Sequence, residues 1–262
     1  MKNKIRGEFI LKFLIVGDVC GRPGREAFRK YVPELKKEHN IDVVVVNGEN
    51  IAGGRGISRK TLDEIYRAGA DIVTSGNHIW DQKEIVSFID DEPFLIRPAN
   101  YPEGAPGKGY CIYPFKAKNI GVINVSGRTF MPPMDCPFQK VDEILKEIKN
   151  QCDIILVDIH AEATSEKIAM GFYLDGRVTC VVGTHTHVQT ADNRILPKGT
   201  AYISDLGMVG PYNSSLGINV NNAIDKFITC RPVRFEMAEG PNIFSAVVLE
   251  LAEDNSVKSF ER

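Results

Sequence analysis

Two histidines with one residue between them, His185 and His187, end an apolar stretch that begins at Cys180. In an extended chain alternate side chains lie on the same face, so the two imidazoles would be about 6.6 Å apart at the backbone. At that spacing they could hold one metal ion or two adjacent ions. Two surface imidazoles at a strand end would give the same pattern, so the stretch alone does not decide between these interpretations.

Possible metal ligands follow apolar runs at five places in the chain. They are Asp18, Glu49–Asn50, Asn77–His78, His160, and the pair His185 and His187. Because the carboxyl ends of strands in α/β sheets share one edge, where binding sites form, we expect these residues to converge. Singly, each has a simpler interpretation: Asp18 as a helix cap, and Glu49 and Asn50 as turn formers. Their joint occurrence predicts a metal site.

The types of the predicted ligands indicate which metal would bind. Two carboxylates, two or three neutral imidazoles and amide oxygens suit divalent Fe, Mn or Zn better than Ca or an all-oxygen Mg site. There are more ligands than one tetrahedral ion uses, which favours two ions that share a bridging carboxylate. We therefore expect two divalent ions, with Fe or Mn favoured and Zn also suited.

Regular elements must bring these ligands together. Apolar runs predict strands at residues 13–17, 42–46, 71–75, 109–113, 120–125, 153–160, 180–187, 194–196, 200–203, 233–238 and 243–251. Helices are predicted from the Gly/Pro turn at 21–24 to about 37, and at 58–68, 138–150, 165–175 and 221–229. Ser58 is the expected cap of the second helix, and Asp81 with Glu84 resembles a capping box that predicts a further one.

The size and charge of the chain limit the class of protein. With 262 residues, of which 43% are hydrophobic, it can bury a full core, and we expect one domain over 1–262 with residues 1–8 as a loose tail. The 32 Lys and Arg nearly balance 34 acids. This balance argues against general nucleic-acid binding. A phosphate-bearing substrate would have to be held locally, by metal or by a few cations.

The cysteines and the apolar segments bear on location. Six cysteines are scattered without a Cys-x-x-Cys pair, which favours a reducing cytoplasm and no structural disulfides. Lys12 interrupts the first apolar run and no cleavage site follows, so this run predicts a core strand rather than a signal peptide. No stretch is long enough to span a bilayer, and no membrane partner is expected.

The same residues carry a resemblance to a known family. Gly17–Asp18, Asn47–Asn50, Gly76–His78, His160 and Gly183–His187 resemble, in this order, the motif blocks of the calcineurin-like metallophosphoesterases. Three segments are similar to the bacterial YmdB-like branch, known for cyclic-nucleotide phosphodiesterase activity. They are Asn-Gly-Glu-Asn-Ile-Ala-Gly-Gly, Gly-Asn-His-Ile-Trp-Asp and Ser-Asp-Leu-Gly-Met-Val-Gly-Pro. The resemblance covers nearly the whole chain. It implies an α/β fold, a four-layer α/β/β/α sandwich of two mixed sheets, with a dinuclear centre.

The resemblance also implies a division of the ligands. Asp18 and His187 would bind one metal, Glu49 would bridge, Asn50 would lie nearby, and Asn77, His160 and His185 would complete the second site. His78 would be a non-ligand acid or phosphate contact. Where the family often has Asp-x-His, this chain has Asp18-x-Cys20. Either one coordination position of a metal is then open or filled by water, or Cys20 is a thiolate ligand. A small buried thiol is the commoner case.

Two metals of this kind can hold a bridging hydroxide at neutral pH and align a phosphodiester for in-line attack. His78 could protonate the leaving alkoxide or stabilise equatorial charge, and the sequence does not separate these roles. We expect a phosphodiesterase for small cyclic nucleotides, 2′,3′-cyclic or 3′,5′-cyclic. Arg55 and Arg128 are candidate substrate contacts, with exposed loop arginines as the alternative.

Other functions remain open from the sequence. The same centre could serve a phosphomonoesterase or protein phosphatase, or a metal-stabilised regulatory or RNA-associated binding protein. The apolar segments Met131–Pro133 and Met208–Tyr212 could be buried against another copy in a homo-oligomer, or could be a lid or core contact.

Overall fold

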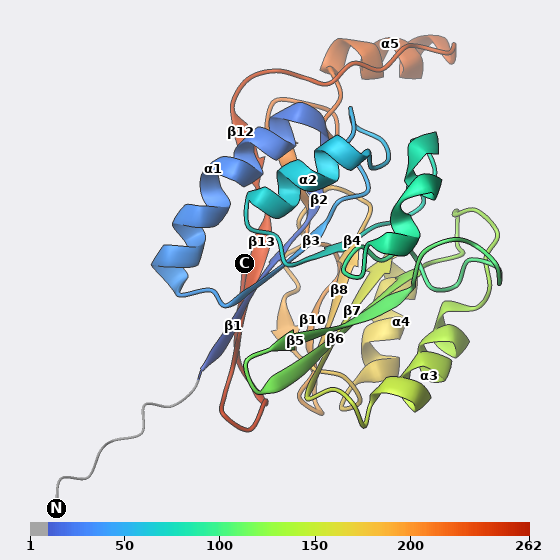
Figure 1. Cartoon of the computed structure of the whole chain (residues 1–262). Helices are drawn as coiled ribbons and strands as arrows, with labels where there is room; N and C mark the ends of the chain where they lie inside the picture. The colour runs from blue at the N-terminus through green and yellow to red at the C-terminus, as the bar shows by residue number, and fades with distance from the viewer. Residues whose placement is uncertain (1–9) are drawn as a thin grey trace, which may run out of the picture.

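Two β-sheets lie face to face in the computed structural model, which describes residues 10–262 (Figure 1). The first sheet has the order β14 (Val257–Glu261), β13 (Ala246–Leu251), β1 (Leu11–Val16), β3 (Val43–Asn47) and β4 (Ile72–Thr74). β1, β3 and β4 are parallel, whereas β13 is antiparallel to both of its neighbours. This sheet is therefore mixed.

The second sheet has the order β5 (Tyr110–Phe115), β6 (Lys118–Ser126), β7 (Ile154–His160), β8 (Cys180–Thr184), β10 (Ala201–Ile203) and β9 (Arg194–Ile195). Its four central strands are parallel and its two edge strands are antiparallel to them. The predicted hairpin of β5 and β6 is confirmed.

Helices cover the outer face of each sheet. α1 (Gly21–His39) and α2 (Arg59–Arg67) pack on the first sheet, and α3 (Pro137–Ile148) and α4 (Thr164–Leu174) pack on the second. In β1, Phe13 and Ile15 face the second sheet while Leu14 and Val16 face the helices. Both faces of a parallel strand are thus buried, which accounts for the unbroken apolar runs. The four-layer α/β/β/α sandwich is confirmed.

A third, small sheet was not predicted. It joins β2 (Asp18–Val19), β11 (Met208–Pro211) and β12 (Asn242–Phe244). The stretch 208–211 is therefore a buried strand, and the predicted strand 243–251 is divided at Ser245 between two sheets. Gly17 allows this arrangement, because a Cβ there would lie 2.0 Å from the carbonyl oxygen of Gly207.

Residues 212–241 form a long excursion between β11 and β12. It carries α5 (Val220–Thr229), which lies at the top of Figure 1. The strand predicted at 233–238 is wrong: the segment has only an isolated bridge between Ile218 and Met237. The excursion supplies part of the wall of the cavity described below.

The helix predicted to begin at Asp81 is also wrong. Two short 3₁₀ helices, Lys83–Ser87 and Ile89–Asp91, occupy this region, and no side chain caps either of them. The cap of α2 is confirmed, because the Ser58 hydroxyl accepts from the backbone N–H of Thr61. The predicted tail at residues 1–8 lies outside the described residues. Within residues 10–262, no helix combines the length and apolarity needed to cross a bilayer.

Candidate metal centre

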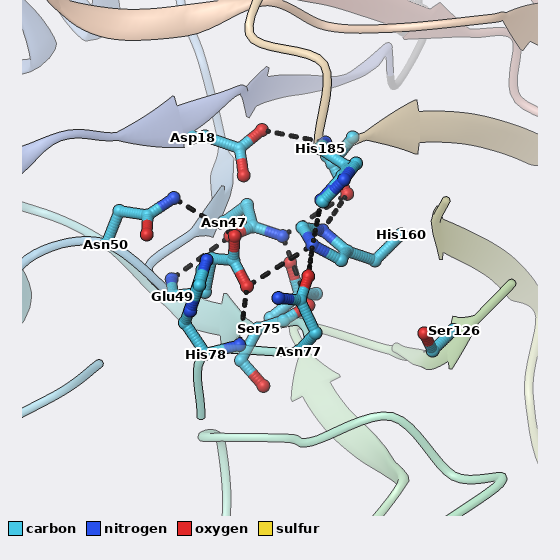
Figure 2. A network of polar contacts seen from close by, with 12 residues as sticks. Asp18, Asn47, Glu49, Asn50, Ser75, Asn77, His78, Ser126, His160 and His185 are labelled. Atoms are coloured by element: carbon cyan, nitrogen blue, oxygen red, sulfur yellow. Dashed lines mark hydrogen bonds and ion pairs between the residues drawn. The ribbon is translucent and has the colours of Figure 1, made fainter. Parts of the chain in front are cut away.

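Side chains from five chain segments meet where the strands of the two sheets end (Figure 2). Asp18, Glu49 and His187 form one group, and Glu49, His160 and His185 form a second. Within each group the potential ligand atoms all lie within 4.8 Å of one another. Glu49 belongs to both groups. Two metal ions that divide these residues as the family resemblance implies stay a prediction.

The second group centres on one imidazole nitrogen. His160 Nε2 lies 3.0 Å from Asn77 Oδ1, 3.0 Å from His185 Nδ1 and 3.2 Å from Glu49 Oε2. An imidazole nitrogen carries at most one proton, so hydrogen bonds cannot satisfy this convergence of lone pairs. A cation would satisfy them together.

The first group contains a buried oxygen without a partner. Asp18 Oδ2 accepts from the backbone N–H of His185 at 3.2 Å, but Asp18 Oδ1 has no hydrogen-bond partner within residues 10–262. Its distance to His187 Nε2 is 3.9 Å, and Asn50 Nδ2 is 3.2 Å from the same nitrogen. An unsatisfied carboxylate oxygen at a fully buried position is costly. The donor set therefore fits a cation here too.

Gly76 leaves the room that an ion needs. A Cβ at this position would lie 2.3 Å from His160 Nε2 and 2.4 Å from Glu49 Oε2. Any larger residue would therefore push its side chain among the ligand atoms of the second group. This explains the glycine in front of Asn77 and His78 without reference to backbone flexibility.

Burial and charge set the protonation of the ligands. Burial raises the pKa of Asp18 to about 7, although His187 and His160 oppose the shift. Burial acts in the same direction on Glu49, but His160 and His78 together outweigh it and hold the pKa of Glu49 at about 2. Burial, reinforced by His160, lowers the pKa of His185 to about 3. Glu49 is thus a carboxylate and His185 a neutral imidazole, the forms that bind metals.

His185 and His187 lie beyond the end of β8. Their φ angles are 103° and 65°, in the left-handed region that side chains other than glycine rarely adopt. The prediction of one extended strand with both imidazoles on one face is therefore wrong. A turn sends one ring to each group, which depends on backbone geometry that spacing alone does not reveal.

A buried ion pair holds this turn. Asp205 Oδ2 accepts from the backbone N–H of Thr186 at 3.0 Å and from its hydroxyl at 2.7 Å. The same oxygen lies 2.6 Å from Lys167 Nζ, and both charged side chains are 1% exposed. Thr186 is the residue between the two histidines, so its contacts with the ion pair hold the backbone of His185–His187 in place.

We expect Lys167→Met to lower the free energy of unfolding by about 3–5 kcal/mol, because it leaves the buried Asp205 carboxylate without its counter-ion. Urea unfolding in the presence of chelator would measure this effect without a contribution from metal binding. Adding Asp205→Asn should recover part of the loss. A change below about 1 kcal/mol in the single variant would contradict the importance of the pair.

A hydroxyl orients His160 from the other side of the ring. Thr184 Oγ1 donates to Asp158 Oδ1 at 2.8 Å and can then accept from His160 Nδ1 at 2.9 Å. With Nδ1 protonated, Nε2 of the neutral ring has the lone pair that a metal ion would bind beside Glu49. Asp158 is buried and also accepts from Thr74 at 2.5 Å and Asn47 at 3.2 Å. The sequence did not point to this support.

Thr184→Val removes the hydroxyl but keeps the shape, and we expect it to weaken metal binding about 10–100-fold because His160 loses its orienting partner. Competition titration against a metal-sensitive dye would give the affinity. Thr184→Ser is the matched control and should bind metal like the unmodified protein. Equal affinity of the valine variant would show that Thr184 does not set the tautomer.

His78 borders the centre without joining either group. Its backbone N–H donates to Glu49 Oε2 at 3.1 Å, and its Nδ1 lies 2.9 Å from Asp81 Oδ2. The side chain is 26% exposed, so the ring reaches solvent at the mouth of the site. Asp81, which the sequence suggested as a helix cap, instead orients this imidazole.

Two further residues support the histidines. Cys20 Sγ is 3.6 Å from Nδ1 of His187, the nitrogen that also contacts the carbonyl of Leu216, and not from the Nε2 that faces Asp18. Cys20 is therefore absent from both groups of potential ligands found within residues 10–262. Glu162 Oε2 lies 3.0 Å from His185 Nε2, a carboxylate–histidine contact that no sequence pattern indicates.

A cavity of about 280 Å³ opens over the centre. Its lining includes Glu49, His78 and His187, together with Leu216 and Met237 from the excursion. Arg55, one of the two candidate substrate contacts, also lines it. Arg128 is not part of the lining, and its guanidinium lies 3.7 Å from Cys136 Sγ.

Comparison with known proteins adds to this geometry. The family described as "YmdB-like protein" matches residues 14–262. A protein of Bacillus subtilis named 2′,3′-cyclic-nucleotide 2′-phosphodiesterase is 52% identical over 249 residues, which are 95% of this chain and 94% of that protein. A structure from Thermus thermophilus, described as a hypothetical protein, has a TM-score of 0.91 at 41% identity and covers 96% of this chain and 97% of its own.

A second solved structure, described as a novel phosphatase from Mycoplasma pneumoniae, is as close in shape. Its TM-score is also 0.91, at 35% identity, and the match covers 97% of this chain and 92% of that one. The similarity thus extends over both sheets and their helices rather than over the motifs alone.

Proposed function

Because the chain belongs to the YmdB-like branch of the calcineurin-like metallophosphoesterases, we propose that it is a metal-dependent phosphodiesterase that hydrolyses 2′,3′-cyclic nucleotides. The observation that carries the proposal is the pair of ligand groups that share Glu49. The name of the Bacillus subtilis relative supports the substrate class. Hydrolysis of 3′,5′-cyclic nucleotides would need the same centre and is tested below.

Each ligand group would hold one divalent ion. Asp18, Glu49 and His187, with Asn50 beside them, would bind the first, and Glu49, His160 and His185, with Asn77, would bind the second. Carboxylate, imidazole and amide ligands favour Fe or Mn, with Zn also suited. When bound, such ions activate water and offset phosphoryl charge.

The protein's own side chains would then direct the reaction. Water adds to phosphorus while the bond from phosphorus to the 2′ oxygen breaks, and that oxygen needs a proton as it leaves. His78 is placed to give it, because Asp81 holds Nδ1 and leaves Nε2 for the substrate. Arg55 lines the same cavity and would contact the phosphate.

Three substrates test the proposal: a 2′,3′-cyclic nucleotide, the 3′,5′-cyclic isomer, and a phosphomonoester such as a nucleoside 3′-phosphate. We expect the first to have the highest kcat/KM and elemental analysis to find about two metal ions per chain. Chelation should abolish turnover, and added Mn should restore it. Faster hydrolysis of the phosphomonoester would instead make the chain a phosphatase, and metal-loaded protein that hydrolyses none of the three would support a binding role.

A further inference from the structure

We propose that a groove between α1 and α2 binds the phosphates of a single-stranded RNA whose 3′ end, closed as a 2′,3′-cyclic phosphate, enters the metal centre. This inference rests on the proposed function. In such a substrate the 2′ and 3′ oxygens of the last nucleotide are both bonded to the cyclic phosphate. The RNA chain can therefore extend only from the 5′ oxygen of that nucleotide. Additional phosphates must then lie on the protein surface beside the cavity.

The groove has a volume of about 510 Å³ and is strongly cationic. Five of its lining residues are basic and two are acidic; they are Arg22, Arg25, Arg29, Lys60 and Arg67, with Glu26 and Glu64. The chain as a whole carries a formal charge of −2. Positive charge is therefore concentrated here, whereas the overall balance argued only against general nucleic-acid binding.

The cations form two rows along the helices. Arg22, Arg25 and Arg29 are spaced three and four residues apart, so they share one face of α1 over about 10 Å. Lys60 and Arg67, seven residues apart, form the facing row on α2. Rows of this length suit the successive phosphates of one flexible strand better than a single anion.

Most of these charges are available to a ligand. Within residues 10–262, Arg29 and Lys60 form no hydrogen bond or close ion pair, although both lie near Glu64. Among the residues that the structure describes, Arg22 and Arg67 pair with Glu26 and Asp63 of their own helices, and Glu239 also lies near Arg22. Arg22 and Arg67 remain 81% and 76% exposed. Such exposed pairs are weak and exchange readily for phosphate.

The groove lies beside the turn that carries Glu49 and Asn50. Arg25 Nη1 donates to the carbonyl of Ile51 at 2.5 Å and its Nε to Glu64 at 2.6 Å, so one side chain joins both helices to the turn after Asn50. The backbone N–H of Gly21 donates to the carbonyl of Asn50 at 2.8 Å. Both helices begin at the edge of the first sheet that carries the ligands (Figure 1).

Residues close in sequence line the groove and the cavity. Cys20 lines the cavity, and Arg22, two residues later, lines the groove. Arg55, on the loop that joins β3 to α2, lines the cavity as well. A strand with its cyclic end at Glu49 would thus meet Arg55 first and the two rows of the groove next.

The test compares two substrates that end in the same nucleoside: a 2′,3′-cyclic mononucleotide and a five-nucleotide RNA with a 2′,3′-cyclic end. At low salt we expect the RNA to have the higher kcat/KM, by about tenfold or more. Its dependence on salt should be steeper, by about 0.7 in log–log slope for each phosphate bound. The double variant Arg29→Glu, Lys60→Glu should lose this advantage and leave turnover of the mononucleotide within about twofold.

Lys30→Glu is the matched control. Lys30 is exposed on the same helix but does not line the groove, so the same reversal of charge there should affect neither substrate. Equal kcat/KM for both substrates in the unmodified protein would overturn the proposal that the groove binds RNA. An equal loss of kcat/KM for both substrates in the double variant would overturn it too. Circular dichroism of each variant would check that the fold is kept.

Failure of the proposed function gives a different result. If the unmodified, metal-loaded protein hydrolyses neither substrate, RNA binding to the groove is measured instead. The fluorescence anisotropy of a labelled RNA with an ordinary 3′ end gives the affinity. A loss of affinity of about tenfold or more in the double variant, but not in Lys30→Glu, would still support it. Binding that all three proteins share, or lack, would overturn it.

Discussion

Glu49→Ala should lose both metal ions and reduce kcat/KM for a 2′,3′-cyclic nucleotide by about 10³-fold or more. Within residues 10–262, Glu49 is the one residue that belongs to both ligand groups, and its carboxylate is buried between them. Its loss removes several kcal/mol of transition-state stabilisation that the metals supply, which corresponds to a factor of this size. Elemental analysis of dialysed protein, alongside steady-state kinetics, would measure both effects.

Two other variants separate bridging from simple ligation. His187 belongs to the first group only, so His187→Ala should retain about one ion per chain. Glu84→Ala is the matched control, since Glu84 is exposed and outside both groups, and it should keep both ions. Retention of two ions by Glu49→Ala would show that the groups bind metal independently, and the shared carboxylate would then have no bridging role.

The layers of the fold could be predicted because the pattern that marks them is local. A run such as Val43–Val46 is apolar on both faces, which indicates a strand buried between helices and a second sheet. The small sheet could not be predicted in this way. β2 has two residues and β11 has four, which are too few to show an alternation of apolar and polar side chains. Their pairing depends on the close approach of Gly17 to Gly207, which are 190 residues apart in the sequence.

The convergence of the candidate ligands could be predicted for a related reason. The carboxyl ends of the strands share one edge of a sheet, regardless of the conformation of the loops. The sequence therefore predicts that residues as distant as Asp18 and His187 meet. The supporting contacts depend instead on side-chain directions. Asp81 reads as a helix cap until the structure shows it against His78. Lys167 looks like a surface residue of α4 until Asp205, 38 residues later, is placed beside it.

His78→Ala should keep both metal ions yet lower kcat for a 2′,3′-cyclic nucleotide by about 10²–10⁴-fold, the range for loss of a general acid. The imidazole is outside both ligand groups, so metal content should not change. The hydrogen bond from its backbone N–H to Glu49 remains in the alanine variant, which keeps the Glu49 carboxylate in place. Metal loss equal to that of Glu49→Ala would make His78 a structural residue instead.

The leaving group decides which role His78 has. An alkoxide needs a proton to leave, whereas a nitrophenolate is stable without one, so loss of a general acid should matter little for a nitrophenyl phosphodiester. We expect His78→Ala to slow the cyclic nucleotide at least about tenfold more than the nitrophenyl ester. An equal effect on both would favour stabilisation of equatorial phosphoryl charge, which every substrate develops. Asp81→Asn should follow the same pattern with a smaller effect, because it weakens the orientation of the ring and leaves the imidazole present.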